Sequence, residues 1–80
     1  MEREKIEKKV INIVTNCVEN GIEITLESSL SGDLRLDSLD RAELEIKCEK
    51  EFGITFYNDE IVDTDTVKDV IDYIEKKLNN

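Results

Sequence analysis

The chain has 80 residues, a formal net charge of -9 and no histidine. This acidity argues against binding to nucleic acid or anionic membranes, which requires a basic face, and favours encounters with basic protein partners. The absence of histidine excludes the Ser-His-Asp and Cys-His mechanisms and the usual zinc sites, so a serine hydrolase is not expected.

Residues 2–19 form the first predicted helix. Apolar side chains recur there at three- and four-residue spacing from Ile6 to Val18, which gives one apolar stripe. Cys17 belongs to this stripe and is expected to be a small buried side chain rather than a reactive thiol. Asn20 and Gly21 form the predicted stop, because both tolerate the left-handed conformation of a helix C-cap.

Residues 21–36 form a long predicted loop that is rich in serine, and residues 27–30 are compatible with one short helical turn. A long, anchored loop that leads into a helix is a common place for function. The side chains spaced to anchor this loop to the core are Ile24, Leu26, Leu30 and Leu34.

Residues 37–52 form the second predicted helix, with Gly53 as its C-cap. Asp37 is a good N-cap, and Asp40, three residues further on, completes a pattern much like a capping box. Ser38 then stands at the very start of the helix, where its hydroxyl is held outward. From these residues alone, Ser38 is either an alternative N-cap or a functional hydroxyl.

This second helix carries two apolar stripes, given a rotation of about 100° per residue. One side is formed by Leu39, Ala42 and Ile46. The opposite side is formed by Leu44, Cys48 and Phe52, and it is assigned to the core because it carries the bulky aromatic ring. The first side then remains as an exposed strip beside Ser38, which suggests a docking or ligand surface. The alternative is that neighbouring helices bury both sides.

Residues 54–57 are interpreted as an extended link, because a strand there would lack a partner. Asn58 is the predicted N-cap of a short third helix, in which Ile61 and Val62 pack inward.

The last predicted helix spans residues 66–78, with Thr66 and Asp69 as a capping box. The elements together predict an all-α fold: a small four-helix bundle with three longer helices, one short third helix and a long loop between the first two. Acidic residues in the second half match no EF-hand spacing, so we expect no metal site and at most weak surface association with calcium or magnesium. They are Asp59, Asp63, Asp65, Asp69 and Asp72.

Cys17 and Cys48 lack CxxC spacing and do not look like a disulfide framework, so a reducing compartment is expected. The first residues are mostly charged, and no apolar run is long enough for a signal core or a membrane span. We therefore expect one domain over residues 1–80, acting as a monomer in the cytoplasm without stable membrane association.

The segment Leu36-Asp37-Ser38-Leu39-Asp40 resembles the Asp-Ser-Leu attachment motif of acyl carrier proteins. The resemblance continues without gaps from about residue 30 to residue 78. It implies that a phosphopantetheinyl transferase joins 4′-phosphopantetheine to Ser38 through a phosphodiester. The thiol of that arm would hold acyl groups as thioesters, for fatty acid synthesis or a specialised lipid or secondary-metabolite pathway. The protein itself would catalyse nothing.

The resemblance also implies roles for further residues. Asp37 would help to position the transferase and its metal-bound coenzyme A. The surface that docks acyl-processing enzymes with basic patches would consist of Leu39, Asp40, Ala42, Glu43, Ile46 and Glu49. The space for an acyl chain between the helices would be lined by Leu44, Cys48, Phe52, Ile61 and Ile71.

The chain departs from the family pattern at several positions. Arg35 stands where many members have Gly, and Thr64 occupies a position usually filled by a branched aliphatic residue of the acyl pocket. Such departures leave two roles open, the main carrier of fatty acid synthesis and a specialised carrier of a secondary pathway. The alternative to a carrier is an acidic helical protein-interaction module in which Ser38 is only a helix N-cap.

Overall fold

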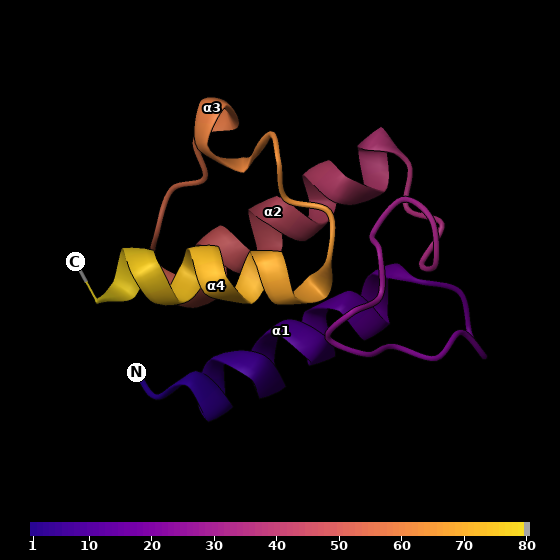
Figure 1. Cartoon of the computed structure of the whole chain (residues 1–80), viewed down its shortest axis with the longest axis horizontal. Coiled ribbons are helices and arrows are strands. Elements are labelled where there is room, and N and C mark those ends of the chain that lie inside the picture. Colours follow the sequence, from indigo (N-terminus) through magenta and orange to yellow (C-terminus); the bar gives the residue numbers. More distant parts are fainter. Residues whose placement is uncertain (80) are drawn as a thin grey trace.

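The computed structural model describes residues 1–79 as helices joined by loops (Figure 1). The helices are α1 (Arg3–Cys17), α2 (Ser38–Phe52), α3 (Asn58–Ile61) and α4 (Val67–Leu78). Within this part of the chain there is no strand, and one isolated bridge pairs Ser29 with Thr66. The predicted all-α fold, with three longer helices and a short third one, is therefore confirmed.

The core lies between the three longer helices, because α1 packs against both α2 and α4. α1 and α4 turn their apolar stripes inward, as the spacing predicts. The stripe of α1 is buried at Ile6, Val10, Ile13 and Val14. That of α4 is buried at Val67, Val70, Ile71 and Ile74.

The two apolar sides of α2 differ sharply in exposure. Leu44 and Cys48 are 1% and 0% exposed, whereas Leu39 and Ile46 are 79% and 50% exposed. The assignment of the Leu44 side to the core is confirmed, and the alternative of two buried sides is wrong. Burial also raises the pKa of the Cys48 thiol to about 12, so this thiol stays protonated near neutral pH.

Side-chain caps fix the starts of α2 and α4. The Asp40 amide donates to Oδ1 of Asp37 at 2.9 Å, and Oδ2 of Asp40 accepts from the Asp37 amide at 3.3 Å. Thr66 and Asp69 make the same reciprocal pair at the start of α4, with both distances 3.1 Å. Both predicted capping boxes are confirmed, and so is Gly53, which ends α2 with a left-handed φ of 67°.

The predicted end of the first helix is wrong. α1 ends at Cys17, and its C-cap Val18 is extended. Gly21 does adopt a positive φ of 91°, but in a turn beyond the helix. The chain leaves the helical path early because Val18 and Ile22 pack against the core. Cys17 is half-buried rather than buried, and desolvation raises the pKa of its thiol.

The predicted details of the short helix are also corrected. Asn58 is the first residue of α3, and Tyr57 takes the cap position without a side-chain hydrogen bond. Ile61 is buried as expected, but Val62 is 73% exposed. A single helical turn directs only one of these two adjacent side chains into the core.

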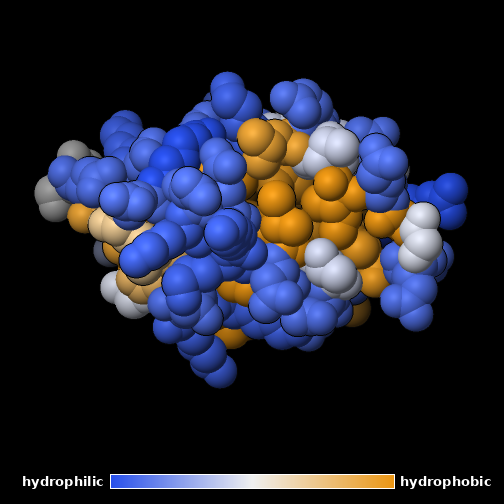
Figure 2. Space-filling view, turned by 90° about the horizontal axis from the view of Figure 1, so that it is seen from below, coloured by the Kyte–Doolittle hydropathy of each residue, from blue (hydrophilic) through white to orange (hydrophobic). Residues whose placement is uncertain are grey.

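The long loop between α1 and α2 is anchored as predicted, although residues 27–30 do not form the expected helical turn. Leu30 and Leu34 are buried, and the Leu30 amide donates to the Asp65 carbonyl oxygen at 2.6 Å. Figure 2 views the molecule from the side of α1 and shows apolar surface gathered in one region among hydrophilic residues. On α1 and the loop, partly buried apolar side chains against the core include Ile11, Val18, Ile22, Ile24 and Leu26.

Candidate functional site

Ser38 is the first residue of α2, and its side chain is exposed. Asp37 supplies the N-cap through its carboxylate, so the interpretation of Ser38 as the cap is wrong. Within residues 1–79, no side-chain hydrogen bond uses the Ser38 hydroxyl. The hydroxyl is therefore available for chemistry, while its neighbour carries out the structural task.

The segment that leads into Ser38 is held firmly. Leu36 is only 5% exposed, and its amide donates to the Leu30 carbonyl oxygen at 2.9 Å. Just before it, Arg35 adopts a left-handed φ of 56°. This conformation explains why glycine suits that position, because glycine reaches it without steric cost. The buried leucine fixes the backbone two residues before the exposed serine.

The start of α2 also suits a phosphodiester at Ser38. The first amides of a helix point outward without intrahelical partners, and the helix dipole adds positive character there. The Asp37 carboxylate accepts a hydrogen bond from the Asp40 amide. The amides of Ser38 and Leu39 are then left facing the site. A phosphoryl group on the Ser38 oxygen would lie beside these donors, as anions do at other helix N-termini.

The predicted docking residues occupy two different places. Leu39, Ala42 and Ile46 are exposed and form a strip along α2 from Ser38. Asp40 serves the capping box at one end of the strip, and Glu43 forms an ion pair of 3.1 Å with Lys47. Glu49 lies apart from them, because its Oε2 accepts from the Phe56 amide at 2.8 Å in the link to α3.

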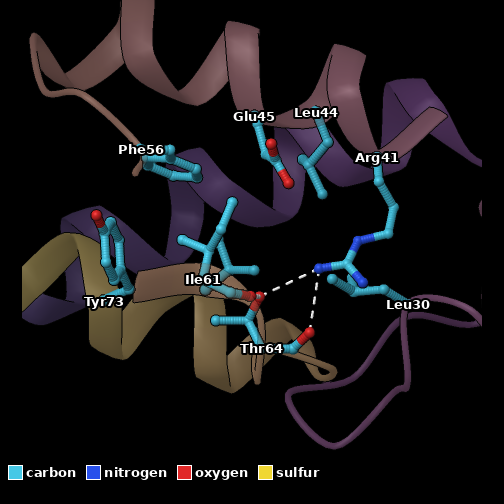
Figure 3. A pocket seen from close by; sticks show the side chains of 9 residues that line it. Leu30, Arg41, Leu44, Glu45, Phe56, Ile61, Thr64 and Tyr73 are labelled. Atoms are coloured by element: carbon cyan, nitrogen blue, oxygen red, sulfur yellow. Dashed lines mark hydrogen bonds between the residues drawn. The ribbon is translucent and has the colours of Figure 1, made fainter. Parts of the chain in front are cut away.

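A small cavity lies between α2, α3 and α4, one turn along α2 from Ser38 (Figure 3). Its volume is about 10 Å³, which is room for about one water molecule. Of the predicted acyl-pocket residues, Leu44 and Ile61 line this cavity. Cys48, Phe52 and Ile71 lie in the core but not in the cavity wall. The other lining residues are Leu30, Arg41, Glu45, Phe56, Thr64, Val70 and Tyr73.

The wall of the cavity includes charged groups that the sequence reasoning missed. Nη2 of Arg41 donates to the carbonyl oxygen and to Oγ1 of Thr64, both at 3.1 Å (Figure 3). Burial raises the pKa of Glu45, and the nearby Arg41 opposes that rise. The available signal was helical spacing, because Arg41 precedes Leu44 by three positions and Glu45 by four. Thr64, noted from the family pattern, does line the cavity.

The remaining acidic residues do not gather into a metal site: within residues 1–79 no group of three or more Asp, Glu, Cys or His could hold an ion. In the same part of the chain, no helix is long and apolar enough to cross a membrane.

Comparison with known proteins agrees with this geometry. The family model described as "Phosphopantetheine attachment site" matches residues 8–74. The acyl carrier protein of Coprothermobacter proteolyticus is 46% identical over 79 residues, which cover 98% of this chain and 96% of the relative. The chain belongs to the acyl carrier protein family.

Further acyl carrier proteins are similar over nearly the same span. That of Porphyromonas gingivalis is 45% identical over 75 residues, covering 92% of this carrier and 96% of the relative. That of Rickettsia canadensis is 41% identical, covering 92% of this carrier and 87% of the relative. Carriers of this family use 4′-phosphopantetheine as their cofactor and work with phosphopantetheinyl transferases and acyl-processing enzymes.

Proposed function

We propose that Ser38 is the residue that carries the 4′-phosphopantetheine arm. The observation that carries this proposal is the exposed, unused Ser38 hydroxyl at the start of α2, beside an aspartate that caps the helix in its place. Attachment makes the Ser38 oxygen part of a phosphodiester. The hydroxyl proton is lost, and the bond between the two phosphates of coenzyme A breaks, releasing adenosine bisphosphate. Asp37 helps to position the transferase and its coenzyme A.

The protein works as a carrier and is not itself an enzyme. The thiol of the bound arm holds acyl groups as thioesters, and the chain presents them to enzymes in turn. A tether of this kind replaces free diffusion with a high effective concentration at each docked partner. The chain lacks histidine, and its buried Cys48 thiol stays protonated, which supports a carrying rather than a catalytic role.

The exposed strip of Leu39, Ala42 and Ile46 docks the partner enzymes. Asp40 and Glu43 flank this strip and attract basic surfaces, and the net charge of -9 adds long-range steering. Glu49 contributes through this longer-range charge, because its carboxylate is engaged with the Phe56 amide. The same acidity supports the absence of nucleic acid among the partners.

The acyl end of the arm rests against the cavity lined by Leu44 and Ile61. Cys48, Phe52 and Ile71 belong to the same buried core as Leu44. The polar wall at Arg41 and Thr64 favours service in a specialised lipid or secondary-metabolite pathway over general fatty acid synthesis. Residues 1–80 act as one domain and as a monomer, and the two unpaired cysteines suit the cytoplasm.

Intact-protein mass spectrometry after incubation with coenzyme A and a broad-specificity transferase tests the attachment. We expect a mass increase of one phosphopantetheine group in the wild-type chain and none in Ser38→Ala. Ser31→Ala is the matched control, because Ser31 is an exposed serine of the preceding loop, and it should accept the arm normally. An increase that persists in Ser38→Ala would rule the proposal out.

A further inference from the structure

Arg41 lines the cavity beside α2 and is hydrogen-bonded across it, which bears on the acyl group that the proposed function places on the arm. Nη2 of Arg41 donates to both the carbonyl oxygen and Oγ1 of Thr64 at 3.1 Å. Thr64 lies between α3 and α4, and its hydroxyl in turn donates to the Ile61 carbonyl oxygen at 2.7 Å. The two hydrogen bonds from Arg41 therefore tie α2 to the opposite wall of the cavity (Figure 3).

The cavity has no room for an acyl chain of several carbons. Its volume of about 10 Å³ suffices for about one water molecule. A chain that passes between Arg41 and Thr64 must break both hydrogen bonds. Methylene groups would then lie against the guanidinium of Arg41 and the carboxylate of Glu45, and charged groups are costly to leave unpaired in apolar surroundings.

The same two side chains suit a hydroxyl group. A guanidinium has five N–H donors, and those on Nε and Nη1 of Arg41 are not used in the bonds to Thr64. Glu45 lines the same cavity and offers carboxylate acceptors, while its charge disfavours a second carboxylate. An acyl hydroxyl offers both an acceptor for Arg41 and a donor for Glu45.

We propose that Arg41 is a specificity-determining residue that keeps long saturated acyl chains out of the helix bundle and, with Glu45, favours short hydroxyacyl groups on the arm. Long chains would have to open the cavity, whereas a short hydroxyacyl group binds at its rim without breaking the bonds to Thr64.

The test loads the wild-type chain, Arg41→Met and Lys50→Met with octanoyl, butyryl or 3-hydroxybutyryl arms from the corresponding coenzyme A thioesters. Arg41→Met keeps an unbranched side chain but removes every donor. Lys50→Met removes a charge from an exposed position of the same helix and is the matched control. Mass spectrometry verifies loading first. A wild-type chain that fails to load would overturn the proposed function and this proposal with it, whereas the outcomes below overturn the role of Arg41 alone.

Amide chemical shifts and the melting temperature then report whether the acyl group enters. For the octanoyl arm, we expect wild type and Lys50→Met to show little change at Leu44, Ile61 and Val70 relative to the unacylated holo form. Arg41→Met should show large changes there and a melting temperature higher by ~4–8 °C than its own holo form. Large changes at these amides in the octanoylated wild type would overturn the proposal without reference to any variant.

The second comparison tests the preference for a hydroxyl. In the wild type, 3-hydroxybutyryl should shift the Nε–H signal of Arg41 and slow thioester hydrolysis severalfold relative to butyryl. Both effects should vanish in Glu45→Ala, and the difference in hydrolysis rate should vanish in Arg41→Met. Equal hydrolysis rates for the two wild-type thioesters, with an unmoved Arg41 signal, would overturn the role of Arg41 in binding hydroxyacyl groups.

Discussion

Asp37 and Ser38, neighbours at the start of α2, have different roles. Asp37 caps the helix through the Asp40 amide, and Ser38 presents a free hydroxyl one position later. From the sequence, Asp37 was recognisable as a good cap, but Ser38 could also have filled that role because serine and aspartate cap equally well. The backbone decides the matter, since Asp37 is extended while Ser38 is already helical.

This division predicts different effects of two alanine substitutions on stability. Asp37→Ala removes the cap and should lower the free energy of unfolding by about 1 kcal/mol. Ser38→Ala should change it by less than about 0.5 kcal/mol, because the exposed serine holds nothing in place. Urea unfolding of the apo form measures both. A loss of about 1 kcal/mol in Ser38→Ala would return the capping role to the serine.

At the scale of elements, α2 has two apolar sides with separate purposes. The side of Leu44 belongs to the core, and the side of Leu39 and Ile46 faces solvent next to Ser38. An exposed apolar strip on an otherwise charged helix is best explained by contacts made with other proteins.

Alanine substitutions at Leu44 and at Ile46 should affect different properties, because the two residues lie on opposite sides of α2. Leu44→Ala should lower the free energy of unfolding by roughly 2–5 kcal/mol, because it leaves a cavity in the core. Ile46→Ala should lower the free energy of unfolding by less than about 0.5 kcal/mol. It should, however, raise the KM that a partner enzyme such as the transferase shows for this carrier. Thermal unfolding and transferase kinetics measure the two effects. Equal losses of thermal stability would contradict the assignment of the sides.

Helix type and core faces were predictable from the sequence, because burial follows helical spacing at positions such as Val10 and Ile74. Helix ends were less predictable. α1 stops before Gly21 because Val18 and Ile22 are drawn to the core by packing, which no local signal records. The position of Val62 likewise depends on how α3 lies against its neighbours.

The candidate site was likewise only partly predictable from the sequence. Ser38 and the exposed strip follow from local pattern and family resemblance, whereas the cavity wall depends on residues brought together from distant parts of the chain. Arg41 and Thr64 are 23 positions apart in sequence, and only the fold reveals that they meet. A charged residue on a helix is usually assigned to solvent, which is why Arg41 and Glu45 were not expected in the wall.

At the scale of the whole molecule, the net charge of -9 has two effects. Repulsion between like charges opposes the compact folded state, and the negative field favours encounters with basic partner proteins. Ion pairs between helices offset part of the repulsion: Nη1 of Arg3 on α1 lies 2.7 Å from Asp72 on α4, and Nζ of Lys9 on α1 lies 2.8 Å from Glu51 on α2. Pairs as exposed as these contribute only about 0–1 kcal/mol each. Repulsion among the excess carboxylates should therefore outweigh them.

This balance predicts the effect of salt on the melting temperature. Raising sodium chloride from 0.01 M to 1 M shortens the Debye length from about 30 Å to about 3 Å. The melting temperature of the apo form should rise, because screening weakens repulsion more than it weakens the ion pairs. Differential scanning calorimetry measures it. A fall in melting temperature would show that the ion pairs dominate.

The proposed carrier role depends on Ser38 as the point of attachment, and peptide mapping tests this most directly. Trypsin cleaves after Arg35 and Arg41, so the peptide from Leu36 to Arg41 contains Ser38 as its only hydroxyl side chain. Ser28, Ser29 and Ser31 fall in the preceding peptide. After treatment with coenzyme A and a transferase, tandem mass spectrometry should find the phosphopantetheine mass on the Leu36–Arg41 peptide alone. Its presence on the preceding peptide, with Leu36–Arg41 unmodified, would contradict the account.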